Sequence, residues 1–371
     1  MLTALTGPAS ASNPNILYAV KAGDALAAAE GYNLKYFVAD DTSSPSGALS
    51  AAQRLVQQDH VLAVIAISDL TFGAAPYLKA QGIPVIGGAV DSTEWTTDDN
   101  MFSVFGFPDY TKVTSTVGKF FKLVGATNVG AVGYGIVPSA ADSAKGTAVS
   151  AEAAGLRAGY INAQFPLGST NVGPIVLAMK SAGIDGLNIL LQQNTAFAIT
   201  TALSQQGVHL KAALLSDGYG QALLSAGPGA IQAAQNAYFE VGWEPVEMHT
   251  AATKKFQSYL RGAGFDGGPG LPEYLAYTSF DALVKGLRAA GSNPTHASLI
   301  SAMLKMSSYD GAGLFGGHTV GFEMSQRGIG SSGADGCVWI TRFENKSFTL
   351  VKGADPICGG VLPGKTVSAS S

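Results

Sequence analysis

Short apolar segments rich in β-branched residues alternate with amphipathic segments between residues 34 and 241. Apolar segments bounded by turn residues predict buried strands, and the amphipathic segments between them predict helices. The order strand, helix, strand, repeated many times, is typical of a parallel sheet that is covered by helices on both faces. The pattern therefore predicts an α/β fold built from doubly wound, Rossmann-like sheets.

This series of units is interrupted at residues 105–110, where Gly106, Pro108 and neighbouring aromatic residues predict a connection. We expect a helix over residues 109–124 directly after it. A series of units on each side of the interruption predicts two doubly wound lobes, with the chain crossing between them near residue 107. The expected strands are 34–39, 61–65 and 84–86 before the interruption, and 128–132, 156–161, 187–191 and 212–215 after it.

The C-terminal third departs from the alternation. Amphipathic helices are expected over 246–261 and 272–290, and two apolar runs, 338–343 and 347–351, predict an antiparallel hairpin in a glycine-rich segment. The only two cysteines, Cys337 and Cys358, flank this hairpin. We expect a structural disulfide between them, which would indicate an oxidising compartment. Two free, buried thiols are the alternative.

Charge and hydropathy exclude several classes of partner. The 371 residues include 22 Lys+Arg and 26 Asp+Glu, for a net charge of -4, and Lys254-Lys255 is the only adjacent basic pair. Because nucleic acid is bound through basic patches, we expect no nucleic-acid partner. No apolar run reaches the 18 or more residues that a membrane span requires. Charged residues make up 13% of the chain, against roughly 25% in typical globular domains.

No motif indicates catalysis, a cofactor or a metal. Residues 262–267 and 328–333 match GxGxxG, but the first follows a predicted helix and the second lies in the glycine-rich tail. A dinucleotide fingerprint must instead leave a strand and open a helix. The five histidines are isolated, and no P-loop, GxSxG or HExxH sequence occurs. We therefore expect a non-enzymatic protein without cofactor or metal.

Polar residues follow several predicted strands, where open α/β sheets bind their ligands. Helix N-termini also present free N–H groups to anions at this edge. For each of these groups, simple capping of the next helix is an equally strong alternative. The groups are residues 68–71, 87–92, 133–139 and 216–220.

Several segments resemble one known family. They are residues 5–8 (LTGP), Asp40-Asp41 before Pro45, residues 52–56 (AQRLV), residues 61–65 and residues 82–86 (GIPVI). In this order they resemble type I periplasmic solute-binding proteins of ABC transporters, of the Leu/Ile/Val-binding family. The resemblance extends over nearly the whole chain, and its first 90 residues are the most specific part.

The resemblance implies two lobes joined by three crossovers, with a ligand held between them. Lobe 1 would comprise residues 1–107 and 245–322, and lobe 2 residues 108–244 and 323–371. It implies an exported, monomeric carrier, periplasmic or cell-surface anchored, whose leader is absent from this chain. The carrier would capture a small polar or zwitterionic ligand, such as an amino acid, and deliver it to an ABC permease. A ligand-sensing receptor domain is the alternative.

The resemblance also implies site residues. Asp217 matches the acidic position that takes a ligand ammonium, while Ser139 and Gln192 align with further lining positions. Trp243 and Tyr274 are candidate lining aromatics, for which lobe packing is an equal alternative. Hydroxyls and backbone N–H groups that would hold a carboxylate are provided by Ser68, Asp69, Leu70, Thr71, Ala89, Val90 and Asp91.

Two departures from the family pattern affect this site. Phe105-Gly106 stands where an aromatic–arginine pair is usual, and Asp91 stands where a threonine is common. Lobe 1 therefore lacks one familiar polar anchor, and Asp91 would either bind an ammonium or repel a carboxylate.

Overall fold

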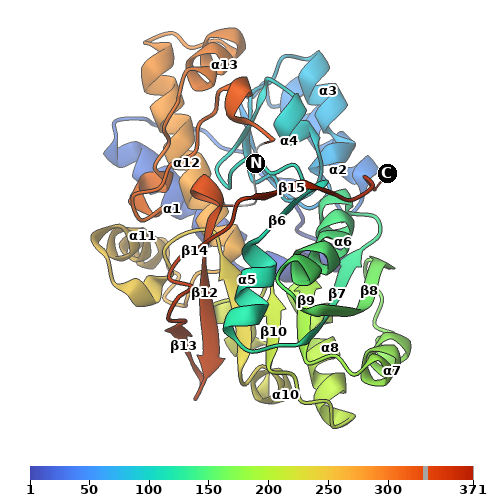
Figure 1. Cartoon of the computed structure of the whole chain (residues 1–371). Coiled ribbons are helices and arrows are strands. Elements are labelled where there is room, and N and C mark those ends of the chain that lie inside the picture. The colour runs from blue at the N-terminus through green and yellow to red at the C-terminus, as the bar shows by residue number, and fades with distance from the viewer. Residues whose placement is uncertain (329–332, 371) are drawn as a thin grey trace.

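The computed structural model describes residues 1–328 and 333–370 as an α/β protein with two large sheets (Figure 1). The first sheet has the strand order β2-β1-β3-β4-β5, and all of its neighbouring strands are parallel. Its central strands are buried on both faces, which explains their uninterrupted apolar sequences. The strands are β1 (Leu2–Thr3), β2 (Ala39–Asp40), β3 (Val64–Ile67), β4 (Val85–Gly87) and β5 (Met101–Ser103).

The second sheet has the order β13-β12-β11-β10-β9-β7-β8. Strands β7 to β11 are parallel, and β12 and β13 are added as an antiparallel hairpin at one edge. The predicted C-terminal hairpin is thereby confirmed. The strands are β7 (Asn128–Tyr134), β8 (Arg157–Phe165), β9 (Gly186–Leu190), β10 (Ala212–Leu215), β11 (Ala237–Val241), β12 (Cys337–Glu344) and β13 (Ser347–Leu350).

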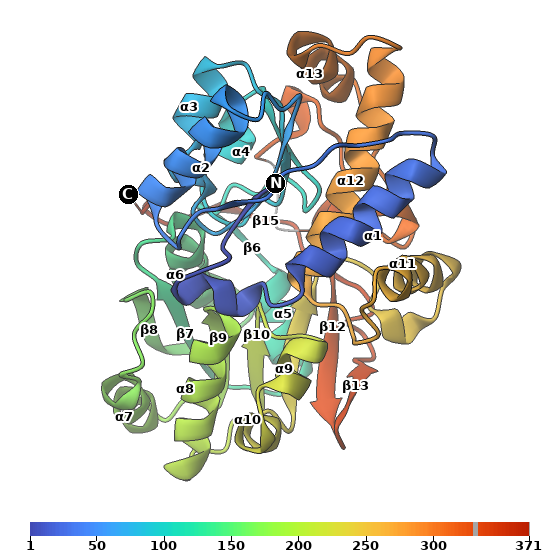
Figure 2. The ribbon, with the colours of Figure 1, turned by 180° about the vertical axis from the view of Figure 1, so that it is seen from behind.

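Helices cover both faces of each sheet, as Figures 1 and 2 show from opposite sides. In the first sheet, α1 and α12 pack on one face and α2 to α4 on the other. In the second, α5 and α6 lie on one face and α7 and α8 on the other. The helices are α1 (Ile16–Ala29), α2 (Pro45–Gln57), α3 (Ala75–Ala80), α4 (Glu94–Thr97), α5 (Thr116–Leu123), α6 (Pro138–Ala153), α7 (Gly173–Ala182), α8 (Gln193–Gln205), α9 (Gln221–Ser225), α10 (Pro228–Ala233), α11 (Ala251–Gly262), α12 (Leu271–Ala290) and α13 (His296–Leu304).

The chain passes between the two sheets three times. It leaves the first sheet after β5 and builds the second sheet up to β11. It then returns through α11 and α12, which pack against α1, before β12 joins the second sheet again. The fold class predicted from the alternation is therefore confirmed. The residue boundaries of the two lobes stay a prediction.

Two predicted elements differ from the structure. Of the strand expected over 34–39, only β2 at Ala39–Asp40 forms, since the short partner β1 offers pairing to two residues. The helix expected over 109–124 begins at Thr116, because residues Lys112–Thr114 form strand β6. Strand β6 pairs with β15 (Val361–Thr366) near the C-terminus, a contact across the chain that local periodicity does not contain.

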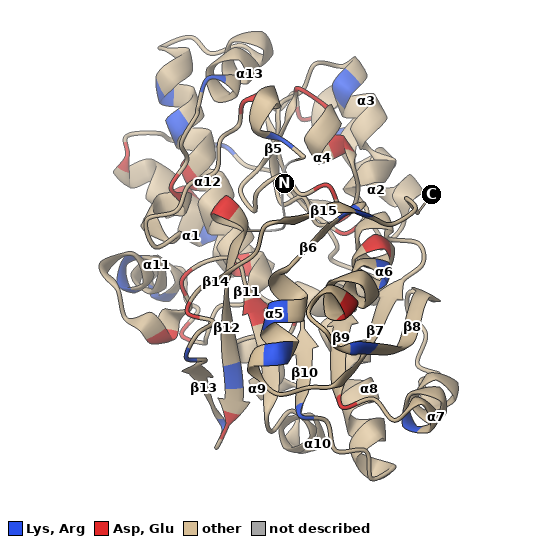
Figure 3. Ribbon diagram, viewed as in Figure 1, with Lys and Arg blue, Asp and Glu red and all other residues tan. Residues whose placement is uncertain are grey.

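Positions of Lys and Arg and of Asp and Glu are scattered along the ribbon in both halves of the molecule (Figure 3). Among the described residues, no helix combines the length and the hydrophobicity that crossing a membrane requires.

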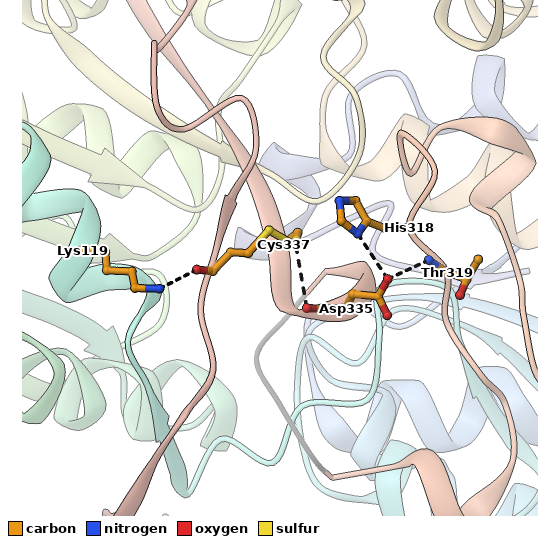
Figure 4. Close-up of a disulfide and its surroundings, with 6 residues drawn as sticks. Lys119, His318, Thr319, Asp335 and Cys337 are labelled. Atoms are coloured by element: carbon orange, nitrogen blue, oxygen red, sulfur yellow. Dashed lines mark hydrogen bonds and ion pairs between the residues drawn. A yellow bond between two sulfur atoms is a disulfide. The ribbon is translucent and has the colours of Figure 1, made fainter.

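Cys337 and Cys358 form a disulfide, as predicted, at the point where β12 pairs with β14 (Ile357–Cys358). Figure 4 shows His318 and Asp335 beside this bond, and Lys119 of α5 donating a hydrogen bond to the carbonyl of Cys358. His318 and the two sulfurs lie close enough together to suggest a metal site, but the disulfide uses both sulfurs. The bond ties the chain that follows the hairpin back to the second sheet.

We expect the double variant Cys337→Ala/Cys358→Ala to unfold with a free energy lower by about 3 kcal/mol, since the loop is no longer closed in the unfolded chain. Urea denaturation of the variant and of the wild type measures this difference. The wild type kept in a reducing agent is the control and should match the variant. A variant as stable as the oxidised wild type would contradict this role of the bond.

Candidate functional site

A cavity of about 240 Å³ lies between the carboxyl ends of the strands of the two sheets. Its walls come from the segments after β3 and β4 on one side and after β7, β9 and β10 on the other. This is the edge at which α/β sheets bind ligands, because chain turns and helix N-termini meet there. The predicted site residues that line the cavity are Ser68, Asp69, Val90, Ser139, Gln192 and Asp217.

The wall after β3 is organised around Ser68. Its Oγ donates to Asp41 Oδ2 at 2.5 Å and accepts from the backbone N–H of Leu70 at 3.0 Å. Thr71 Oγ1 donates to the carbonyl of Ser68 at 3.1 Å. Leu70 and Thr71 are buried and do not line the cavity, so their contribution is to hold the turn that presents Ser68 and Asp69.

The segment after β4 contributes Val90 to the cavity, but its neighbours face away from it. The N–H of Ala89 is bound to Ser103 Oγ at 3.0 Å. Asp91 is fully buried and accepts from the N–H of Phe72 at 2.8 Å and from Trp95 Nε1 at 2.6 Å. Burial raises the pKa of Asp91 to about 7, although these hydrogen bonds act against the shift. Asp91 therefore stabilises the wall of the cavity to which it belongs, by linking Phe72 and Trp95.

Direct hydrogen bonds connect the two sides of the cavity. Ser139, in the first turn of α6, donates through Oγ to the carbonyl of Val90 at 2.5 Å. Gln192, which precedes α8, donates through Nε2 to Asp69 Oδ2 at 2.9 Å. The side chains after β7 and β9 therefore reach the turns after β4 and β3, and the cavity is bridged as well as enclosed.

Asp217 follows β10 and lies beside the N-terminal segment of the chain. Its Oδ2 accepts from Ser12 Oγ at 2.6 Å and from the N–H of Gln193 at 3.2 Å, and its Oδ1 accepts from the N–H of Gly218 at 2.7 Å. Burial raises the pKa of Asp217 despite these bonds. The carboxylate is thus oriented by both sides of the cavity and keeps further acceptor capacity.

Trp243 and Tyr274 are fully buried and do not line the cavity of about 240 Å³. Their rings stack with centroids 5.5 Å apart, and Tyr274 donates its hydroxyl to the carbonyl of Glu244 at 3.0 Å. Trp243 also packs against Phe105, at 5.2 Å between centroids. These aromatics fill the region where the chain crosses between the sheets, which corresponds to the packing alternative stated above.

Sequence reasoning missed lining residues from three elements. Ser12 lies in the short helical turn after β1, Tyr134 ends β7 and Glu240 lies within β11. Tyr134 donates to Thr195 Oγ1 at 3.0 Å, and burial raises its pKa to about 12. Glu240 could have been found from the sequence, because an acidic residue within the apolar run 237–241 is unusual in a buried strand and indicates a specific role. Ser12 and Tyr134 carry no such signal.

The lining is acidic. Its carboxylates belong to Asp69, Asp109, Asp217 and Glu240, and among the described lining residues Lys112 is the single basic side chain. Burial raises the pKa of Asp69 to about 6; the bond from Gln192 lowers it, and the charge of Asp217 adds to the rise. Such a lining favours a ligand that donates hydrogen bonds or carries positive charge.

The first GxGxxG sequence lacks the strand that a dinucleotide site requires. Residues 262–267 begin at the last residue of α11 and precede α12 without a strand between them. Of the second sequence, residues 329–332 lie outside the described part of the chain.

Comparisons with known proteins give one family and one fold. The model of a family described as periplasmic binding protein matches residues 1–347. No curated protein sequence matches the chain.

Solved structures resemble the whole molecule. A leucine-binding protein from Thermotoga maritima is 17% identical with a TM-score of 0.77, covering 94% of this chain and 96% of its own. A branched-chain amino acid transporter substrate-binding protein from Streptococcus pneumoniae, in complex with isoleucine, is 18% identical with a TM-score of 0.76, and 97% of each chain is covered. A solute-binding protein of an ABC transporter from R. palustris, in complex with 4-hydroxybenzoate, is 16% identical with a TM-score of 0.75, covering 100% of this chain and 96% of its own. The fold is therefore the type I periplasmic binding protein fold.

We expect Asp69→Asn to stabilise the empty protein relative to the wild type more at pH 7.5 than at pH 4.5, by roughly 1 to 3 kcal/mol. A carboxyl whose pKa is higher in the folded state binds its proton more tightly there. Its unfavourable contribution therefore grows as pH rises from about 4 through about 6. Urea denaturation at both pH values measures the effect, with the exposed Asp266→Asn as control. An equal difference at both pH values would contradict the prediction.

Proposed function

Because the chain belongs to the periplasmic binding protein family, we propose that it is an extracytoplasmic carrier of a small polar or zwitterionic solute. In this proposal the solute occupies the cavity between the two sheets and is delivered to an ABC importer. The carrier makes and breaks no bond of the solute. It acts as a monomer outside the cytoplasm, in the periplasm or anchored at the cell surface.

The observation that carries the proposal is the bridged cavity. Gln192 contacts Asp69, Ser139 contacts Val90 and Ser12 contacts Asp217, each across the space between the sheets. A solute that touches both walls stabilises the closed arrangement of the lobes, whereas either wall alone offers only part of the contacts. Binding and closure are then one equilibrium, and the closed form is what an importer would recognise.

The polar groups of the cavity indicate which end of a solute is bound most strongly. Asp217 and Asp69 present carboxylates to the cavity, so a solute ammonium has partners on both walls. The groups that would hold a carboxylate are committed elsewhere: Ser68 Oγ donates to Asp41, and the N–H of Ala89 donates to Ser103. We therefore favour an amine-bearing solute, either zwitterionic or cationic, over a simple carboxylic acid.

A thermal-shift screen tests this function. The panel contains L-isoleucine, L-arginine, linear amines, 4-hydroxybenzoate, benzoate and neutral sugars, each at millimolar concentration. A solute at 100 times its dissociation constant adds about 2.7 kcal/mol to the free energy of unfolding. Stabilisation by amine-bearing members, followed by a calorimetric 1:1 stoichiometry, supports the proposal. No stabilisation by any member would count against a small-solute carrier.

We expect Asp217→Asn to weaken binding of the solute found in that screen by about 10- to 100-fold, the value of one hydrogen bond to a charged group. The asparagine Oδ1 can still accept from Ser12, so the loss reports on charge rather than on the bridge. Isothermal titration calorimetry measures the affinity, and Asp266→Asn is the control. An affinity changed by less than twofold would show that Asp217 does not contact the solute.

A further inference from the structure

The cavity continues beyond the space between the sheets into a compartment within the second half of the molecule. This compartment lies between the face of the second sheet and helices α5 and α6. The continuation is lined by residues of five elements, so it is not a gap at one loop. They are Thr116 and Val117 of α5, Gly146 and Thr147 of α6, Asn188 of β9, Glu240 of β11 and Val338 of β12.

Side-chain size explains why this space is open. Farther along the same sheet face, Phe120, Phe121 and Tyr238 fill the layer between sheet and helices. The ring centroid of Phe120 lies 5.2 Å from that of Phe121 and 5.2 Å from that of Tyr238. Nearer the cavity, α6 presents Ser143, Gly146 and Thr147 instead. A Cβ added at Gly146 would meet only Val113 Cγ2, at 3.8 Å. Small residues on α6 thus leave the compartment unfilled.

Glu240 is the charged group of this compartment. It follows Tyr238 by two residues on β11, so its side chain emerges on the same face of the sheet. Among the residues that the structure describes, none forms a hydrogen bond or ion pair with its carboxylate. Burial alone raises its pKa to about 7. A carboxylate in this position is costly unless a partner is brought to it.

Three of the polar side chains around Glu240 donate hydrogen bonds to other groups of the protein. Asn188 Nδ2 donates to Thr147 Oγ1 at 2.9 Å, and Thr147 Oγ1 donates to the carbonyl of Ser143 at 2.8 Å. Ser150 Oγ donates to the carbonyl of Thr114 at 2.6 Å. Thr116 Oγ1 has no hydrogen-bond partner among the described residues and can donate or accept. The acceptors left are the Glu240 carboxylate and Asn188 Oδ1. A group that fits them must donate hydrogen bonds and carry positive charge.

The basic side chain among the described lining residues is not the partner of Glu240. Lys112, which lines the same cavity, pairs with Asp109 Oδ2 at 3.4 Å and donates to the carbonyl of Gly328 at 2.5 Å. Its side chain is exposed. The counter-charge for Glu240 therefore has to come from outside the described chain.

We propose that the compartment under α5 and α6 binds an ammonium or guanidinium group at one end of an extended solute, with Glu240 as its counter-ion. The other end of the solute then lies between the two sheets, where Asp217 is available. This inference rests on the proposed carrier function and narrows it to solutes with two donor-rich ends.

Calorimetric titrations at pH 8 with 1,5-diaminopentane, agmatine and 1-aminopentane test the role of Glu240. The two doubly charged probes should bind the wild type more tightly than 1-aminopentane. Glu240→Gln should weaken both by about 10- to 100-fold, the value of a hydrogen bond to a charged group, and change 1-aminopentane less than twofold. Glu152→Gln, exposed on α6, is the matched control and should change none of them.

A second variant tests the compartment itself without removing a charge. Gly146→Leu places a side chain in the open space and removes a glycine from the interior of α6, so its thermal midpoint should not fall. The doubly charged probes should then bind at least tenfold more weakly, while 1-aminopentane keeps its affinity. A stably folded Gly146→Leu protein that binds all three probes like the wild type would overturn the proposal.

These outcomes separate the inference from the carrier function. If the wild type binds another solute from the screen in a manner that Asp217→Asn weakens, but Glu240→Gln leaves every affinity unchanged, the compartment is not used and the carrier function stands. Failure of the doubly charged probes to bind the wild type overturns the inference in the same way. If no small solute binds at all, the carrier function falls as well.

Discussion

The opposed carboxyl ends of two parallel sheets are the constraint on which the rest of the structure depends. A parallel strand requires a crossover of a dozen or more residues, so each strand ends in a turn at the same edge. Here the turns after β3 and β4 face those after β7, β9 and β10 across one cavity. The chain crosses between the sheets three times, which ties these edges to each other. The same crossings explain why Trp243 and Tyr274 are packed as a buried stack.

Much of the fold is encoded locally and could be predicted for that reason. Buried parallel strands need apolar residues on both faces, so β3, β7 and β10 stand out as apolar runs. Strand β6 could not be predicted, because it exists only through pairing with β15 near the other end of the chain. For the disulfide, counting gave the only possible intramolecular pair, but it did not exclude two free thiols.

In the candidate site, too, some features are encoded locally and others depend on contacts with distant residues. Strand exits are visible in the sequence, and that rule pointed to Ser68, Asp69, Ser139 and Asp217, which line the cavity. Gln192, which also lines it, was proposed from the family resemblance. The direction in which a side chain points at an exit is set by its neighbours. Asp91 faces Trp95 and the N–H of Phe72 rather than the cavity, and no periodicity in the sequence encodes that choice.

Because the chain contains few charged residues, the acidic side chains that line the cavity require an explanation. In a chain with 13% charged residues, carboxylates enclosed around one cavity are costly, since burial raises the pKa of both Asp69 and Glu240. The hydrogen bond from Gln192 Nε2 stabilises the carboxylate of Asp69, whereas the carboxylate of Glu240 accepts no hydrogen bond from the described residues. A protein that needed only stability would favour an apolar residue at position 240, between Phe239 and Val241. The presence of an acid at this position therefore argues for a partner that carries positive charge.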